Sequence, residues 1–199
     1  MEKNAKKILL IDNNDSFTYN LVALLRKLRV NFTVIAIENF EPNQIGNFSH
    51  VLISPGPDVP RAYPKIYAML QAYIQTQNFQ NIPIFGVCLG HQIICDFFGA
   101  TVYNLPSPRH GMVGQLTLNT AHTSPIFTDL PTTFQVGLYH SWAVSSTDFP
   151  QALQVTARCQ DEIIMAVQHN DLPIFGVQFH PESYISEFGL EILANFIAS

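Results

Sequence analysis

Residues 82–98, IPIFGVCLGHQIICDFF, change from one periodicity to another within a few positions. Residues 82–87 are a short apolar run typical of a buried strand, and residues 91–98 have the composition of a buried helix. We therefore predict a strand, a sharp turn and a helix, with Cys88 on the turn. A strand that leads directly into a helix is the unit from which parallel α/β sheets are built.

The same alternation extends toward the N-terminus. Residues 6–12 are predicted as a buried strand, and apolar residues from Phe17 to Leu28 recur at helical spacing. Further strands are expected over 31–37 and 50–54, followed by a helix over 63–77. This order predicts right-handed crossovers and a sheet covered by helices on both faces.

After Gly99 the pattern changes to short strand-like pieces, expected over 100–104, 115–119, 134–139, 153–159 and 163–168. An apolar run over 173–179 then resembles the earlier buried strands, and 187–198 is predicted as a helix. The expected fold is an α/β fold of flavodoxin-like type: an open, mostly parallel central sheet with helices on both faces and a small antiparallel addition. We expect residues 1–199 to form a single domain.

Composition limits the classes of function. The chain has 199 residues, 47% of them hydrophobic, which suffices for one well-covered core. A net charge of -5 with 13% charged residues argues against nucleic-acid binding. The three cysteines form no CxxC pair, so we expect neither disulfides nor a metal site. We expect the protein to reside in a reducing cytoplasm. The sequence shows no export signal and no apolar run long enough to span a membrane, so we expect neither export nor a membrane span.

Gly86, Cys88 and Gly90 form the pattern Gly-x-Cys-x-Gly, the sulfur analogue of the nucleophile elbow Gly-x-Ser-x-Gly. The glycines permit strained torsions and close approach of neighbouring chain. The start of the following helix favours a thiolate over a thiol. The alternative is a buried structural cysteine, the more common role of this residue.

A second segment, GVQFHPES at residues 176–183, places His180 and Glu182 after another predicted buried strand. The carboxyl ends of parallel strands share one sheet edge, so His180 is expected to meet Cys88 there. His180 would act as base and then acid, and Glu182 would fix its tautomer. Taken separately, these residues could be a strand-end histidine and a surface carboxylate.

A third segment, SPGPDVP at residues 54–60, is rich in proline and glycine and follows a predicted strand. Its rigid path can point backbone amides into the cleft. The amides of Gly56 and Leu89 are therefore candidates for an oxyanion hole. Alone, the segment would be an ordinary turn.

With these segments, the chain resembles the class I (Cys-His-Glu triad) glutamine amidotransferases, in particular the small subunits of anthranilate synthase and aminodeoxychorismate synthase. Five motifs in order carry the resemblance: LIDNNDSFTYNL at 10–21, SPGP at 54–57, GVCLGHQ at 86–92, YHS at 139–141 and GVQFHPES at 176–183. The first of these motifs resembles the one that is characteristic of the chorismate-using branch of the family.

The resemblance implies that Cys88 attacks the side-chain amide of L-glutamine, with His180 and Glu182 completing the triad. It also implies that the glutamine is held by Gly56, Pro57, Asp58, Leu89, Gln92 and the backbone of Ser141 and Trp142. The partner implied is a chorismate-binding synthase subunit that receives the ammonia. No metal or cofactor is expected on this chain, whereas Mg²⁺ is expected on the partner.

Three positions depart from the family pattern. Trp142 stands where leucine is usual, Asp58 replaces the last glycine of the Pro-Gly-Pro-Gly loop, and Met112 replaces lysine in a His-Gly-Lys turn. Two alternative functions remain: a stand-alone thiol hydrolase of the same fold and a non-catalytic regulatory partner. The sequence also leaves open whether the product is anthranilate or aminodeoxychorismate, or whether one subunit serves both pathways.

Overall fold

A computed structural model describes residues 6–199. Within these residues the strands form one nine-stranded sheet in the order β2-β1-β3-β4-β9-β8-β7-β5-β6. The parallel part consists of β1 (Lys7–Asp12), β2 (Asn31–Ala36), β3 (His50–Ile53), β4 (Ile84–Val87) and β9 (Ile174–Val177). The antiparallel part consists of β5 (Val102–Leu118), β6 (Thr133–Val144), β7 (Leu153–Cys159) and β8 (Ile164–His169).

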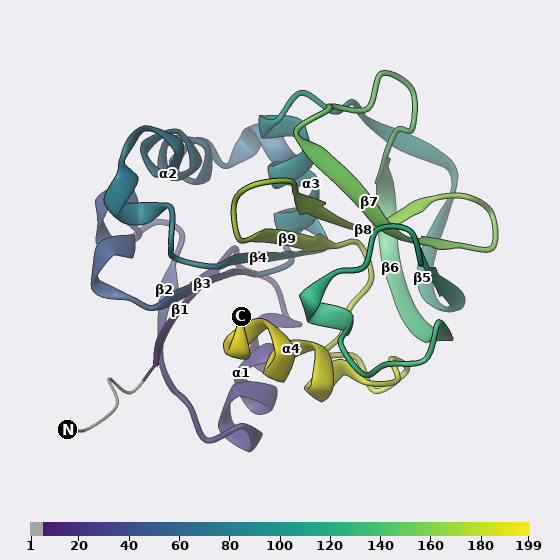
Figure 1. Ribbon diagram of the computed structural model, residues 1–199, viewed down its shortest axis with the longest axis horizontal. Helices are drawn as coiled ribbons and strands as arrows, with labels where there is room; N and C mark the ends of the chain where they lie inside the picture. The colour runs from purple at the N-terminus through teal and green to yellow at the C-terminus, as the bar shows by residue number, and fades with distance from the viewer. Residues whose placement is uncertain (1–5) are drawn as a thin grey trace.

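Helices cover both faces of the parallel strands (Figure 1). Helices α1 (Thr18–Lys27) and α4 (Gly189–Ala198) lie on one face, and α2 (Pro64–Gln75) and α3 (Leu89–Phe97) lie on the other. Strand β1 explains this layering, because successive side chains point to opposite faces. Ile8 and Leu10 belong to the core cluster that contains residues of α1 and α4, whereas Leu9 and Ile11 belong to the cluster of α2 and α3.

Four short 3-10 helices complete the structure of residues 6–199: η1 (Pro42–Asn47), η2 (Pro60–Ala62), η3 (Gln77–Phe79) and η4 (Pro125–Phe127). No helix in this range is both long and apolar enough to span a bilayer. The predicted α/β fold class is confirmed, and the predicted strands of the parallel sheet begin and end within two residues of the observed ones.

The antiparallel part is more extensive than the small addition that the sequence predicts. The pieces expected over 100–104 and 115–119 belong to a single strand, β5, and β6 continues past residue 139 to Val144. The expected turn at residues 110–112 is therefore wrong, because these residues lie inside β5. His110 pairs with Tyr139 and Met112 with Leu138, and the register shifts between the two pairs.

Gly111 is the residue at this bulge, with a φ of 70°. Glycine adopts this left-handed conformation at little cost, which lets β5 accommodate one extra residue without ending. Gly111 thus has the backbone conformation of a turn residue, but β5 continues to pair with β6 on both sides of it.

The edge strand β6 curls back toward the parallel part of the sheet. An isolated bridge joins Gly137 of β6 to His180, with the His180 amide donating to the Gly137 carbonyl at 3.1 Å. This contact brings residues 139–142 of β6 to the carboxyl ends of β4 and β9.

Candidate active site

Cys88 lies on a tight turn between β4 and α3, with φ of 51° and ψ of -100°. The turn is possible because its neighbours lack side chains: a Cβ on Gly86 would lie 2.4 Å from the Gly90 carbonyl carbon. A Cβ on Gly90 would lie 2.6 Å from the carbonyl oxygen of Ile53. The two glycines thus allow α3 to pack directly on β3 and β4, as the Gly-x-Cys-x-Gly pattern predicts.

The loop after β3 lies directly against the start of α3. A Cβ on Gly56 would lie 2.2 Å from Cδ2 of Leu89, so the two residues touch. Asn13 fixes the start of this loop, since its backbone amide donates to Ser54 Oγ and its side-chain amide to the Ser54 carbonyl, both at 2.9 Å. The structure therefore brings together the two residues whose amides we predict to form an oxyanion hole.

His180 and Glu182 form a buried pair immediately after β9. His180 Nδ1 lies 2.7 Å from Glu182 Oε1, and the residues are 2% and 7% exposed. Burial alone lowers the pKa of His180, but the adjacent Cys88 sulfur and Glu182 carboxylate outweigh it and raise the pKa well above 6.5. Among residues 6–199, His180 Nε2 has no hydrogen-bond partner, which leaves it free to exchange a proton with the sulfur.

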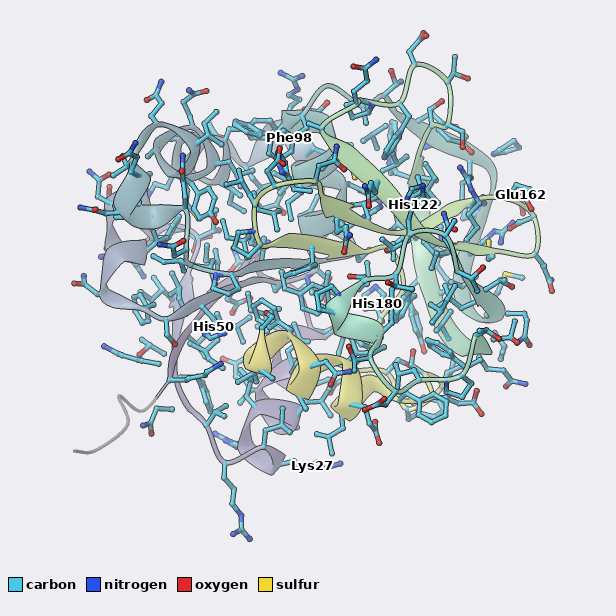
Figure 2. The ribbon with its side chains drawn as sticks, viewed as in Figure 1. Lys27, His50, Phe98, His122, Glu162 and His180 are labelled. Atoms are coloured by element: carbon cyan, nitrogen blue, oxygen red, sulfur yellow. The ribbon has the colours of Figure 1, made fainter. Side chains whose placement is uncertain are left out.

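Two aromatic rings hold the imidazole of His180 in place. The rings of Phe17 and Tyr139 lie 4.7 Å and 5.1 Å from it, measured between centroids, and both contacts are edge-on. Figure 2 shows His180 in the interior of the molecule, whereas Lys27 and Glu162 reach the periphery. The N-terminal motif thus contributes Phe17 to the support of the candidate base.

A cavity of about 150 Å³ opens beside Cys88. It is lined by Cys88 and by every residue predicted to bind substrate: Gly56, Pro57, Asp58, Leu89, Gln92, Ser141 and Trp142. His110, Tyr139 and His140 complete the lining. Its size and position next to the sulfur suit a small polar substrate.

A chain of side-chain amides runs from the wall of this cavity to the sulfur. Gln92 Nε2 donates to the Trp142 carbonyl and to Gln178 Oε1, both at 3.0 Å. Gln178 Nε2 in turn donates to Cys88 Sγ at 3.5 Å. His140 Nδ1 also lies 2.8 Å from the Trp142 carbonyl.

A larger cavity, of about 500 Å³, lies elsewhere, between residues 118–132 and Thr156 of β7. None of the predicted site residues lines it. Within the described part of the chain, no group of three or more His, Cys, Asp or Glu side chains is arranged to hold a metal ion.

Comparison with known proteins agrees with this geometry. The family model described as "Glutamine amidotransferase class-I" matches residues 9–199. The chain belongs to the class-I glutamine amidotransferases. A protein of Haemophilus influenzae named "Putative anthranilate synthase component II" is 54% identical over 192 residues, which are 96% of each chain.

Two further similarities place this amidotransferase within its family. The aminodeoxychorismate/anthranilate synthase component 2 of Bacillus subtilis is 40% identical, covering 96% of this chain and 95% of that protein. A crystal structure titled "putative gmp synthase subunit a protein", from Thermoplasma acidophilum, is 25% identical with a TM-score of 0.84. That similarity covers 98% of this chain and 94% of the other.

Three residues of the amidotransferase site received no role from the sequence. His110 was assigned to a turn, yet its Nε2 lies 3.0 Å from Ser141 Oγ because β5 continues through it. The motif at residues 139–141 contains His140 but indicates no role for its side chain. Gln178 is the one that a closer analysis of the sequence could have found, because it is a lone amide in the apolar run 173–179 and is fully buried.

Proposed function

We propose that this amidotransferase releases ammonia from L-glutamine through a thioester on Cys88 and delivers it to a chorismate-using synthase subunit. The observation that carries the proposal is the meeting of Cys88, the adjacent His180–Glu182 pair and the cavity lined by residues 56–58, 89, 92, 141 and 142. A nucleophile, a base and a substrate pocket beside them are the parts that acyl transfer requires.

In the first half-reaction, the Cys88 sulfur attacks the carboxamide carbon of glutamine and forms a C–S bond. His180 accepts the thiol proton and passes it to the amide nitrogen, whose bond to carbon then breaks. Ammonia leaves, and a γ-glutamyl thioester remains on Cys88. The Glu182 carboxylate stabilises the imidazolium that forms between these two proton transfers.

In the second half-reaction, His180 removes a proton from a water molecule that attacks the thioester carbon. The C–S bond breaks, glutamate leaves and the sulfur recovers its proton. In both halves the carbonyl oxygen becomes negatively charged. We assign its stabilisation to the backbone amides of Gly56 and Leu89; losing one such donor typically costs about 3 kcal/mol of transition-state stabilisation.

The partner in this proposal is a chorismate-binding synthase subunit, component I. Ammonia released into water at neutral pH would be protonated and lost as a nucleophile, so transfer within a complex preserves it. The relatives named as component II of such synthases support this assignment. Mg²⁺ is assigned to the partner, and no step on this chain passes through it. We place the complex in the cytoplasm, where a free thiol persists.

The test is to purify this chain with the protein that binds it and to measure synthesis from chorismate with two nitrogen sources. Cys88→Ser should abolish synthesis from glutamine and leave synthesis from ammonium salt intact. Cys159→Ser removes another buried cysteine and serves as the matched control. Glutamine-dependent synthesis by the Cys88→Ser complex would overturn the proposal.

The same preparation separates the alternatives. A stand-alone thiol hydrolase would purify without a synthase subunit, and a non-catalytic regulatory partner would support synthesis equally well after Cys88→Ser. The product of the wild-type complex, anthranilate or aminodeoxychorismate, assigns the pathway.

A further inference from the structure

The side chain of Gln178 contacts the candidate nucleophile, and its orientation is fixed by a chain of hydrogen bonds that starts at a backbone carbonyl. The Trp142 carbonyl accepts from Gln92 Nε2 at 3.0 Å, and the same nitrogen donates to Gln178 Oε1 at 3.0 Å. Gln178 Nε2 then lies 3.5 Å from Cys88 Sγ. The other triad residues do not take part in this chain.

The direction of every bond in this chain follows from its first member. A backbone carbonyl can only accept, so Gln92 must turn its NH₂ group toward Trp142. That NH₂ group also faces Gln178, which must therefore present its oxygen to Gln92. The NH₂ group of Gln178 is left facing the sulfur, so the sulfur must accept.

Burial makes this arrangement rigid. Gln178 is 0% and Gln92 4% exposed, and the backbone amide of Gln178 donates to the Met165 carbonyl at 2.8 Å. Burial lowers the pKa of His140 to about 4, so near neutral pH its ring is uncharged. Its Nδ1 then carries the proton and donates to the Trp142 carbonyl, which reinforces the acceptor role of that carbonyl.

We propose that the Gln178 amide is a further catalytic group, which donates a hydrogen bond to the Cys88 sulfur and stabilises it as a thiolate aimed into the glutamine pocket. A donor on the charged form of a group favours that form. The thiol proton is thereby directed to His180, because the Gln178 side of the sulfur already receives a hydrogen. The inference rests on the proposed function for the identity of the electrophile, but not for the hydrogen bond itself.

The experiment is the pH dependence of Cys88 alkylation by iodoacetamide in the full chain, with Cys88→Ala as background. Gln178→Met removes the donor, and we expect the midpoint of the alkylation profile to rise by about one pH unit, a tenfold loss of thiolate below the midpoint. Gln178→Glu places a carboxylate beside the sulfur and should raise the midpoint further. In both variants kcat/KM for glutamine should recover at alkaline pH, which a merely structural defect would not produce.

The matched control is Gln154→Met. Gln154 Oε1 accepts from Gln168 Nε2 at 3.3 Å, so this variant removes another contact between two glutamine amides, on β7 and β8. Its alkylation midpoint should equal that of the wild type. An unchanged midpoint in folded Gln178→Met, judged by circular dichroism, would overturn the inference.

A measurement on the unmodified side chain covers the case in which the Gln178 variants do not fold. The side-chain NH₂ resonances of Gln178 in ¹⁵N-labelled protein should shift with pH at the alkylation midpoint and should not titrate there in Cys88→Ala. Resonances that do not titrate in the wild type would contradict the inference. The alkylation profile and the NMR titration do not use glutamine, so failure of the proposed function, seen as glutamine-dependent synthesis by Cys88→Ser, is a separate result.

Discussion

The backbone amide of Cys88 donates to the carbonyl of Val177 at 2.8 Å. This bond joins the end of β4 to the end of β9, three residues before His180. Two segments that are 92 residues apart in sequence, counted from Cys88 to His180, are thus held side by side by the last rung of the parallel ladder. The proposed nucleophile and its proposed base owe their proximity to this strand pairing, and we expect the close packing of α3 on these strands to maintain it.

Gly86→Ala should disrupt this packing. The added Cβ would lie 2.4 Å from the carbonyl carbon of Gly90 and 2.7 Å from the amide nitrogen of His91, both backbone atoms that cannot rotate away. We expect a loss of about 2–3 kcal/mol in the free energy of unfolding and a loss of glutaminase activity, because α3 and Cys88 must shift. Urea unfolding and a glutaminase assay measure the two effects.

Gly99→Ala is the contrasting variant. Nothing lies within 4 Å of a Cβ there, but the φ of 101° is strained for alanine. The free energy of unfolding of this variant should fall by only about 1 kcal/mol, and its glutaminase activity should be kept. If Gly86→Ala were as stable and active as Gly99→Ala, the packing account of the elbow would be wrong.

Glu182→Gln should lower glutamine turnover at least about tenfold while the protein stays folded, because the imidazole loses its orienting charge. The raised pKa of His180 gives a second readout. A histidine whose folded-state pKa lies above the unfolded value contributes stability that is complete below pH 6.5 and is lost as the pH rises through the raised value. Glu182→Gln removes one of the two groups that raise the pKa of His180. The loss of stability with rising pH should therefore begin at a lower pH in this variant than in the wild type.

Glu187→Gln is the matched control for this prediction. Glu187 accepts a hydrogen bond from the backbone amide of Gln135 at 2.7 Å and lies on the same segment, but it does not contact His180. Its kinetic pH profile should match that of the wild type. Equal turnover in the Glu182→Gln and wild-type enzymes would remove Glu182 from the mechanism.

The sequence predicted the parallel half of the fold because four of its five strands, all except β2, are mainly apolar runs that are followed along the chain by an α-helix. The antiparallel half was predicted less well for a physical reason. Residues 104–109 of β5 contain two prolines and few apolar side chains, and their pairing with β6 shifts register between Asn104 and Arg109. What makes β5 a single strand is a partner distant in sequence, which local periodicity does not report.

The candidate site shows the same division. Cys88, His180 and Glu182 lie directly at strand ends, where local pattern and sheet topology together indicate the edge that binds ligands. His110 reaches the pocket only because β5 continues through a bulge. The role of Gln178 depends on the side-chain amide of Gln92 and the backbone carbonyl of Trp142, which come from two other segments. Such contacts are properties of the tertiary structure.

Acidification should destabilise the protein through its buried histidines. Burial lowers the pKa of His91 to about 3 and that of His140 to about 4. Between pH 6.5 and about 4 the unfolded chain therefore binds protons that the folded chain does not, and stability falls as the pH falls. Each such histidine contributes a slope of about 1.4 kcal/mol per pH unit.

The variants His91→Leu and His122→Leu test this effect in urea titrations at pH 7, 6 and 5. His91 is fully buried, whereas His122 lies at the surface. Loss of stability with acidification should be less steep in His91→Leu than in the wild type and unchanged in His122→Leu. The slope is compared, because the packing change at residue 91 also alters the absolute stability. If stability fell with pH at the same slope in the wild type and in both variants, buried His91 would not contribute to the acid destabilisation.

Trp142 should report glutamine binding by its fluorescence. It is the only tryptophan of the chain, it is half-buried, and it lines the cavity beside Cys88. Glutamine held by the backbone at residues 141–142 would displace water from the indole and change its emission. Titration of Cys88→Ser, which binds without turnover, should therefore give a saturable signal that is absent in the double variant with Trp142→Phe. Calorimetric binding without any change in emission would show that glutamine does not contact this wall of the cavity.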